Sequence, residues 1–398
     1  MTQRLFKTAL ILGLLTAIGP FAIDMYLPAL PSIGDKLNAS IPEVQASLMT
    51  FLGAVAVCQI FYGPISDMVG RKPPLYFGLV VFAVASLAAS LSPTIGWLIV
   101  ARFVQGIGAC AMMAIPRAVV RDYHTGPDAA RLMTLLMLVF SVSPILAPLT
   151  GSLIIELWSW RGIFMLMAFC AVLGIVLLTF AMPETRPKEM RLDSSVSSAL
   201  ASYATLLRDR RFLGLSFIGG FGMASFFGFL ANSSFVYIDH YGLDPTQYSF
   251  AFSVNAVAFI GVSQFTATLA RRHGFNAIIR LAATSFSAIT LVLLVLFLAG
   301  VDMLPVLMVF LFFSFGCLGL IIPSSAVLAL DDHGAIAGSA SALMGTIQMV
   351  TGAGVMAIVS AFFNGTAIPM VAGIAVCAAI VLALTTVTLR MPAAILAE

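Results

Sequence analysis

The chain has 398 residues, of which 61% are hydrophobic and 9% are charged, and its formal net charge is +3. A soluble domain carries about 25% charged residues, so this composition excludes an ordinary soluble protein and indicates an integral membrane protein in a lipid bilayer. The small net charge gives no sign of a nucleic-acid partner. The five cysteines lie in apolar runs and match no metal-binding spacing, so we expect no metal site.

Twelve apolar runs are long enough for membrane-spanning helices, which need about 20 residues each. They are longer and more uniformly apolar than the alternating strands of a membrane β-barrel, so the expected fold class is all-α. The predicted helices cover residues 6–30, 46–66, 74–92, 95–118, 130–156, 162–182, 212–237, 247–269, 276–299, 304–329, 335–363 and 367–389.

The basic residues predict the orientation of these helices. With the N-terminus placed in the cytoplasm, 17 of the 20 Lys and Arg residues fall in cytoplasmic loops and tails, two fall outside, and Arg102 lies within a span. Such a bias follows the positive-inside rule, and it predicts a multi-pass protein with both termini in the cytoplasm.

One long polar segment divides the chain into two halves. It predicts an N-terminal six-helix bundle over 1–183, a cytoplasmic linker over 184–211 and a C-terminal six-helix bundle over 212–398. VGRKP in the first half is echoed by RRHGF 204 residues later, and IPRAVVRD is echoed by IPSSAVLALDD 207 residues later. Parallel repeats of six helices are typical of one large class of transporters.

The first predicted helix contains Asp24, the only acidic residue placed deep in a span, within GPFAIDMYLPALP. A charge at the bilayer centre costs at least about 2.5 kcal/mol, so such a residue indicates a function. Pro20 and Pro28 flank Asp24 at four residues on each side and predict a bent helix with free carbonyl groups.

The fourth predicted helix contains Arg102, the only basic residue deep in a span. At 1.5 Å per residue, Asp24 and Arg102 both lie roughly 10–12 Å below the outer surface. Burial disfavours an ionised carboxylate and a nearby arginine favours it. We therefore expect Asp24 to take and release a proton, with Arg102 tuning it or acting as its counter-charge. A structural ion pair that only fixes helix packing is the alternative.

Several motifs point to one family. GPISDMVGRKP, residues 63–73, resembles the signature loop of the major facilitator superfamily, and ARFVQGIGACA, residues 101–111, resembles the fourth-helix R-x-x-Q-G motif of its proton-driven drug exporters. Together with IDMYLPALP, VVRDY and SPILAPLTG, the chain resembles the Bcr/CflA group of drug–proton antiporters.

The resemblance implies two six-helix bundles around a central cavity in a bacterial cytoplasmic (inner) membrane. It implies a monomer that exports small lipophilic antibiotics, such as chloramphenicol or bicyclomycin, in exchange for protons and without a cofactor. It also implies two groups of structural residues: a conformational latch between helices 2 and 11 (Gly63, Asp67, Gly70 and Arg71) and an antiporter motif in helix 5 (Pro144, Pro148 and Gly151).

Candidate substrate-binding residues are polar or aromatic side chains within spans: Tyr26, Gln105, Asn232, Phe235, Asn255 and Gln348. An apolar pocket with a few polar groups suits neutral lipophilic ligands. For each residue the alternative is helix packing, because amides within lipid need partners and the chain has 31 Phe residues.

Other function classes fit less well. The sequence has no phosphate-binding G-x-x-x-x-G-K-[ST] motif for an ATP-driven pump and no H-E-x-x-H motif for a zinc hydrolase. Its four histidines fall in loops or at helix ends, so we expect no enzyme. The main alternative is a proton symporter that imports a small metabolite on the same fold. Such sites usually carry more polar or cationic groups than this chain offers.

Overall fold

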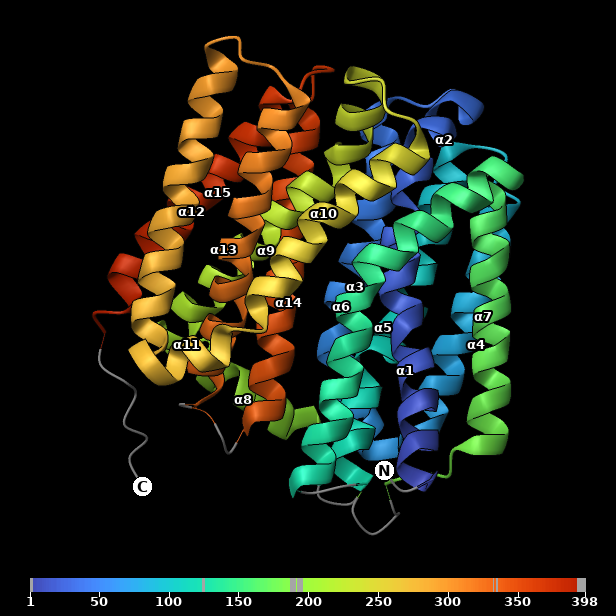
Figure 1. Ribbon diagram of the computed structural model, residues 1–398. Helices are drawn as coiled ribbons and strands as arrows, with labels where there is room; N and C mark the ends of the chain where they lie inside the picture. Colours follow the sequence, from blue (N-terminus) through green and yellow to red (C-terminus); the bar gives the residue numbers. More distant parts are fainter. Residues whose placement is uncertain are drawn as a thin grey trace. The chain divides into compact units, whose positions relative to one another are not determined.

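The computed structural model describes residues 3–123, 126–186, 191, 196–331, 333 and 336–391. In these ranges every regular element is a helix, and 11 helices are long and apolar enough to cross a membrane. A shorter apolar helix, Val142–Leu157, lies within the element that corresponds to the fifth predicted span. The predicted all-α membrane fold is therefore confirmed (Figure 1).

The chain divides into two compact units, Met1–Ala199 and Leu200–Glu398. In the first unit α3 and α4 both pack against α5, while α7 packs against α4 and α6 packs against α1. Its elements are α1 (Gln3–Asp24), η1 (Leu27–Ala29), α2 (Leu30–Leu37), α3 (Ile41–Val69), α4 (Lys72–Ser90), α5 (Ile95–Tyr123), α6 (Gly126–Leu157) and α7 (Trp160–Ala181). The predicted boundaries at 183 and 211 stay predictions.

In the second unit α9 packs against α13, α14 and α15, and α12 packs against α13 and α15. Its elements are α9 (Arg210–Ser234), the π-helix η3 (Phe235–His240), α10 (Pro245–Ser263), α11 (Thr266–His273), α12 (Phe275–Leu298), α13 (Leu304–Asp331), α14 (Ala337–Ala361) and α15 (Ile368–Thr388). A further helix, α8 (Val196–Leu206), spans the division between the units.

Side chains that cap the first backbone N–H groups determine where several helices begin. Asp244 caps α10 by accepting a hydrogen bond from the Gln247 N–H at 2.7 Å, and the Gln247 side chain accepts the Asp244 N–H at 3.1 Å. This reciprocal pair is a capping box, which satisfies two backbone donors. Asp209 similarly accepts the N–H groups of Arg211 and Phe212 at the start of α9.

Two of the predicted spans are found as candidate membrane spans but contain a break between helical segments. The run 6–30 is broken after Asp24 into α1, η1 and α2, and the run 247–269 is broken after Ser263 into α10 and α11. A hydropathy average over a whole span does not locate either break, whereas the prolines around Asp24 do predict the bend in the first of these spans. The seventh predicted span also changes from α-helix to π-helix at Phe235, a change often found at functional sites.

Aromatic packing forms much of the core of the second unit. The Phe229 ring stacks on Phe252 with centroids 5.7 Å apart and meets Phe315 edge-on at 5.0 Å. Phe226 also meets Phe315 edge-on, at 5.7 Å. Offset and edge-to-face pairs are favourable beyond their buried area, so these phenylalanines pack mainly against one another.

Candidate functional site

Asp24 is the last residue of α1 and is only 5% exposed. Pro28 has no N–H group and cannot donate the helical hydrogen bond to the Asp24 carbonyl, so the helix ends there. Among the residues that the structure describes, no hydrogen bond or ion pair reaches the Asp24 carboxylate. Asp24 is thus a buried acid at the negatively polarised end of a helix.

Arg102 on α5 is fully buried and faces the end of α1. Its Nη1 donates to the Ala22 carbonyl at 3.1 Å and to Gln105 Oε1 at 2.5 Å. A cation that bonds a late carbonyl of a helix stabilises the helix C-terminus. Arg102 therefore acts as a cap for α1, two residues before Asp24, and the described residues include no ion pair between Asp24 and Arg102.

The rest of the Arg102 guanidinium lies in an aromatic cage. Its carbon lies 4.6 Å from the ring centre of Tyr26, 4.3 Å from that of Phe51 and 5.8 Å from that of Phe164. Aromatic faces attract cations, which offsets part of the cost of burying the charge. The Nε and Nη2 groups are buried without a hydrogen-bond partner, so two donors of this arginine are unused.

Gln105 connects Arg102 to two neighbouring helices. Its Nε2 donates to Ser86 Oγ on α4 at 2.7 Å and contacts Met167 Sδ on α7 at 3.6 Å. The amide oxygen is left to accept from Arg102, so the orientation of the amide follows from this network. Arg102 and Gln105 are three residues apart on α5, so they lie on one face of the helix and can meet.

Tyr26 is fully buried beside the same cage. Its hydroxyl shares a 2.8 Å hydrogen bond with Ser47 Oγ on α3, and its ring lies 5.5 Å from the Phe164 ring. With its hydroxyl occupied and its ring against Arg102, Tyr26 serves as a wall of the arginine site. A substrate contact by this residue stays a prediction.

The proposed antiporter motif meets the end of α1. Pro144 and Pro148 lie inside α6, and Gly151 follows on the same helix. A Cβ at Gly151 would overlap the carbonyl oxygen of Met25, the residue after Asp24. Only glycine permits this approach, so α6 touches the break in α1 directly next to the buried acid.

The latch residues form a charged cluster at the corner between α3 and α4. Arg71 is 3% exposed, its Nε and Nη2 bond the two carboxylate oxygens of Asp122 at 2.6 and 3.1 Å, and its Nη1 lies 2.7 Å from Asp67. Burial lowers the pKa of Arg71, but the hydrogen bonds and charges of Asp122 and Asp67 raise it above its ordinary value. At Gly63 nothing lies within 4 Å of the position that a Cβ atom would occupy, so packing does not require glycine at this position.

The segment after α7 binds this corner. The Glu184 carboxylate accepts the N–H groups of Arg71, Lys72, Thr185 and Arg186 at 2.8 to 3.1 Å. Burial alone would raise the pKa of Glu184, and these backbone donors instead hold it below its ordinary value. Gly70 has a φ of 99°, and a Cβ there would overlap Glu184, so the corner requires glycine.

The sequence analysis did not predict that Asp122 and Glu184 contact the predicted latch residues. Asp122 lies in VVRDY, at the end of the fourth predicted helix, and Glu184 follows the apolar part of α7 in PETR. The available signal was that each of these two acidic residues lies at the C-terminal end of an apolar run. That signal does not say which loop the residue contacts.

The candidate residues of the second unit lie on four elements and are mostly buried. Asn232 Nδ2 donates to the Gly228 carbonyl at 2.8 Å, and the Phe235 ring lies 6.1 Å from Phe363. Asn255 is 1% exposed, and its amide has no hydrogen-bond partner of normal geometry. Gln348 is half-buried on α14. Their role in substrate binding stays a prediction.

Comparison with known proteins identifies the family. The family model of the Major Facilitator Superfamily matches residues 12–356. The chain belongs to the Major Facilitator Superfamily. This superfamily member is 35% identical to the uncharacterized MFS-type transporter YdgK of Bacillus subtilis, over 91% of the chain and 90% of that protein.

Two further relatives have more informative names. The bicyclomycin resistance protein homolog of Haemophilus influenzae is 30% identical over 94% of each chain. Multidrug resistance protein D of Escherichia coli is 31% identical over 92% of this chain and 91% of its own. The facilitator chain is thus a multi-pass membrane transporter and not an enzyme.

A solved structure supports the fold. A D-xylose–proton symporter superposes with a TM-score of 0.74 over 98% of both chains, at 14% sequence identity. At this identity the likeness concerns the fold alone. It carries no information on what this facilitator transports.

Proposed function

We propose that this facilitator is a proton-coupled multidrug efflux transporter that exports small lipophilic antibiotics of the chloramphenicol or bicyclomycin kind by alternating access. The names of its relatives, which refer to bicyclomycin and multidrug resistance, support drug export as the direction and class of transport. The proposal places the chain in the bacterial cytoplasmic membrane as a monomer with both termini in the cytoplasm. The proton gradient drives it, and it needs no cofactor.

The observation that carries proton coupling is the isolation of Asp24. A carboxylate that is buried without a partner is costly when ionised, and a bound proton removes that cost. When water reaches Asp24, hydration lowers the free-energy cost of the ionised carboxylate, and the proton can leave. In one conformation of the transporter the Asp24 carboxyl group must be protonated, and in another it can be protonated or ionised. Such a carboxyl group can carry one proton per transport cycle.

Arg102 supports this role without pairing with Asp24. It holds the end of α1 through the Ala22 carbonyl, and its Nε and Nη2 donors remain unused. In the proposed cycle, a movement at the α1 break brings the ionised Asp24 carboxylate to these donors. Gly151 on α6 touches the same break at Met25, so a movement of α6 is able to reach Asp24.

In the proposal, drug contacts Tyr26, Gln105, Asn232, Phe235, Asn255 and Gln348. Gly63, Asp67, Gly70 and Arg71 act as the conformational latch, and Pro144, Pro148 and Gly151 act as the antiporter motif. These roles require the two bundles to move against each other. The candidate drug contacts are amide and aromatic side chains without a charge, which suits neutral ligands.

Proton release from purified protein tests this function. Chloramphenicol is added to weakly buffered protein in detergent, and the released protons are measured for wild type, Asp24→Asn and the control Glu156→Gln, which changes an exposed acid at the end of α6. We expect release from wild type and Glu156→Gln and none from Asp24→Asn. Equal release from Asp24→Asn would remove Asp24 from the mechanism. Proton uptake with a sugar or carboxylate, and no response to drug, would indicate a symporter.

A further inference from the structure

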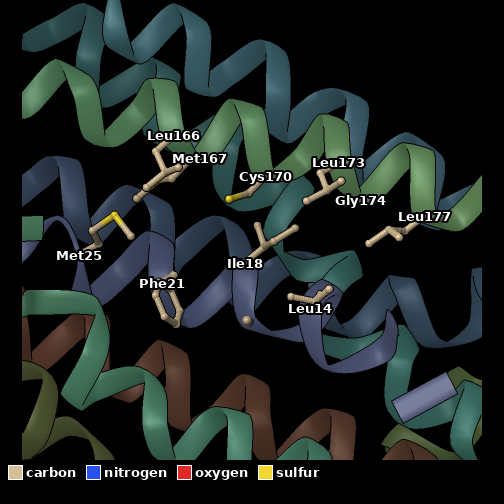
Figure 2. Close-up of a pocket in the computed structure, with 11 residues that line it drawn as sticks. Leu14, Ile18, Phe21, Met25, Leu166, Met167, Cys170, Leu173, Gly174 and Leu177 are labelled. Atoms are coloured by element: carbon tan, nitrogen blue, oxygen red, sulfur yellow. The ribbon is translucent and has the colours of Figure 1, made fainter. Parts of the chain in front are cut away.

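A groove of about 210 Å³ runs between α1 and α7 (Figure 2). Its lining includes Leu14, Ala17 and Met25 from the α1 side and Met167, Cys170 and Leu177 from α7. Every lining residue is apolar, a cysteine or a glycine, so the groove offers carbon and sulfur surfaces and no charged group. Both walls belong to candidate membrane spans, so the surrounding solvent is hydrocarbon.

We infer that this groove holds one acyl chain of a bilayer phospholipid. It is smaller than the roughly 300–1,000 Å³ of a typical drug site, and it lacks the few polar groups that orient a drug. Lipid tails are as apolar as leucine and surround the span at high concentration, so a chain fills the groove without competition from water.

The length of the groove matches a single leaflet. On α1 the lining extends from Leu14 to Met25, and on α7 from Leu166 to Leu177. Eleven residues at 1.5 Å each give roughly 16 Å, which is close to half of the about 30 Å hydrocarbon core. Met25 lies toward Leu166 at one end, and Leu14 lies toward Leu177 at the other (Figure 2). The groove therefore has the length of a single acyl chain.

The rim of the groove is open enough for a chain to enter sideways. Leu14 and Leu173 are exposed at 45% and 42%, whereas Ile18 and Gly174 are buried at the floor. Gly174 lets α7 approach Leu15 and Leu79 closely, since a Cβ there would come within 3.2 Å of both. The floor is thus closed by helix contact while the leucine rim faces the bilayer.

The far end of the bound chain reaches the site described above. Met25 follows Asp24 in the chain, and Met167 contacts Gln105, which holds Arg102. One end of the bound lipid chain therefore packs against the two methionines that separate the groove from these polar residues. Methionine is flexible and adapts to such a variable partner.

A tryptophan at the rim tests the bound chain. Full-length Leu173→Trp protein is reconstituted in vesicles of phospholipid with brominated acyl chains, which quench tryptophan, and is then dissolved in detergent. The control is Val172→Trp, which is exposed on the same helix and does not line the groove. We expect quenching to persist in detergent at residue 173 and to disappear at residue 172. Equal recovery at both positions would overturn the proposal.

The second part of the experiment fills the groove with a larger side chain. Ala17→Phe and, separately, Cys170→Leu are combined with Leu173→Trp, so that a protein side chain occupies the space of the lipid chain. Both combinations should recover fluorescence in detergent as Val172→Trp does. Chloramphenicol added to Leu173→Trp should leave the quenching unchanged. Recovery on adding the drug would assign the groove to substrate and contradict a lipid site.

Discussion

Arg102 donates a hydrogen bond to the carbonyl oxygen of Ala22 and forms no ion pair with Asp24, two residues further along the chain. The two charges that the sequence places at one depth are therefore not paired with each other in this structure. The arginine bonds the end of α1, and no described residue pairs with the carboxylate of Asp24. This arrangement agrees with the proposed role of Asp24 as the proton carrier.

Replacing Arg102 should destabilise the protein even when the charge is kept. Arg102→Lys loses the planar group that lies against Tyr26 and Phe51, and it leaves Gln105 without a positioned donor. A buried polar group without a partner costs about 1–3 kcal/mol, so the unfolding temperature in detergent should fall clearly.

A matched control for this change is Arg161→Lys. Arg161 also bonds a carbonyl, that of Ser92 at 2.7 Å, and also lies over a ring, that of Trp160, but it is half-buried at a helix end. Water can replace its contacts there, so its unfolding temperature should change little. Equal loss in both variants would contradict the special role of the buried cage.

Gly151→Ala should impair proton release triggered by drug. The added methyl group overlaps the Met25 carbonyl and must push α6 away from the break beside Asp24. Gly53→Ala, on α3, is the comparison, because nothing lies within 4 Å of its Cβ position. It should be neutral or slightly stabilising, since alanine is favoured over glycine in helices by up to about 1 kcal/mol. Unchanged release from Gly151→Ala would show that the contact has no functional role.

Arg71→Lys should weaken the corner between α3 and α4. Lysine cannot bond both Asp122 oxygens as the guanidinium does. Breaking a buried pair by removing one partner typically costs about 3–5 kcal/mol, and this conservative change should cost part of that amount. Chemical unfolding of Arg71→Lys, Asp122→Asn and the double variant would measure it, and additive effects would show that the two residues do not interact.

Acid should remove the stabilising effect of Glu184. Its pKa is held below the ordinary value in the folded state, so the unfolded chain binds this proton more readily. The stabilisation is therefore fully present above the ordinary carboxyl pKa and is lost as the pH falls through the folded one. The difference in melting temperature between wild type and Glu184→Gln should stay constant from pH 7 down to the ordinary carboxyl pKa of 4.5 and should shrink below it. Glu156→Gln, changed at an exposed site, should show no such trend.

The amino-acid sequence by itself determined that this is a helical membrane protein with one acid, Asp24, and one base, Arg102, deep within its predicted spans. Long apolar runs can satisfy their backbone groups in lipid only as helices, and a charge within such a run is conspicuous because it is costly. The motifs around Asp67 and Arg102 were enough to indicate the superfamily, which the comparison with known proteins confirmed.

Only the tertiary structure decided which groups these charges meet. Helix spacing placed Asp24 and Arg102 at one depth, but the rotation of α1 and its break before Pro28 direct Arg102 to the Ala22 carbonyl. Glu184 reaches the α4 start from a segment 112 residues away. Such contacts depend on how helices pack and where loops return, and a hydropathy pattern contains neither, because it records only how apolar each residue is.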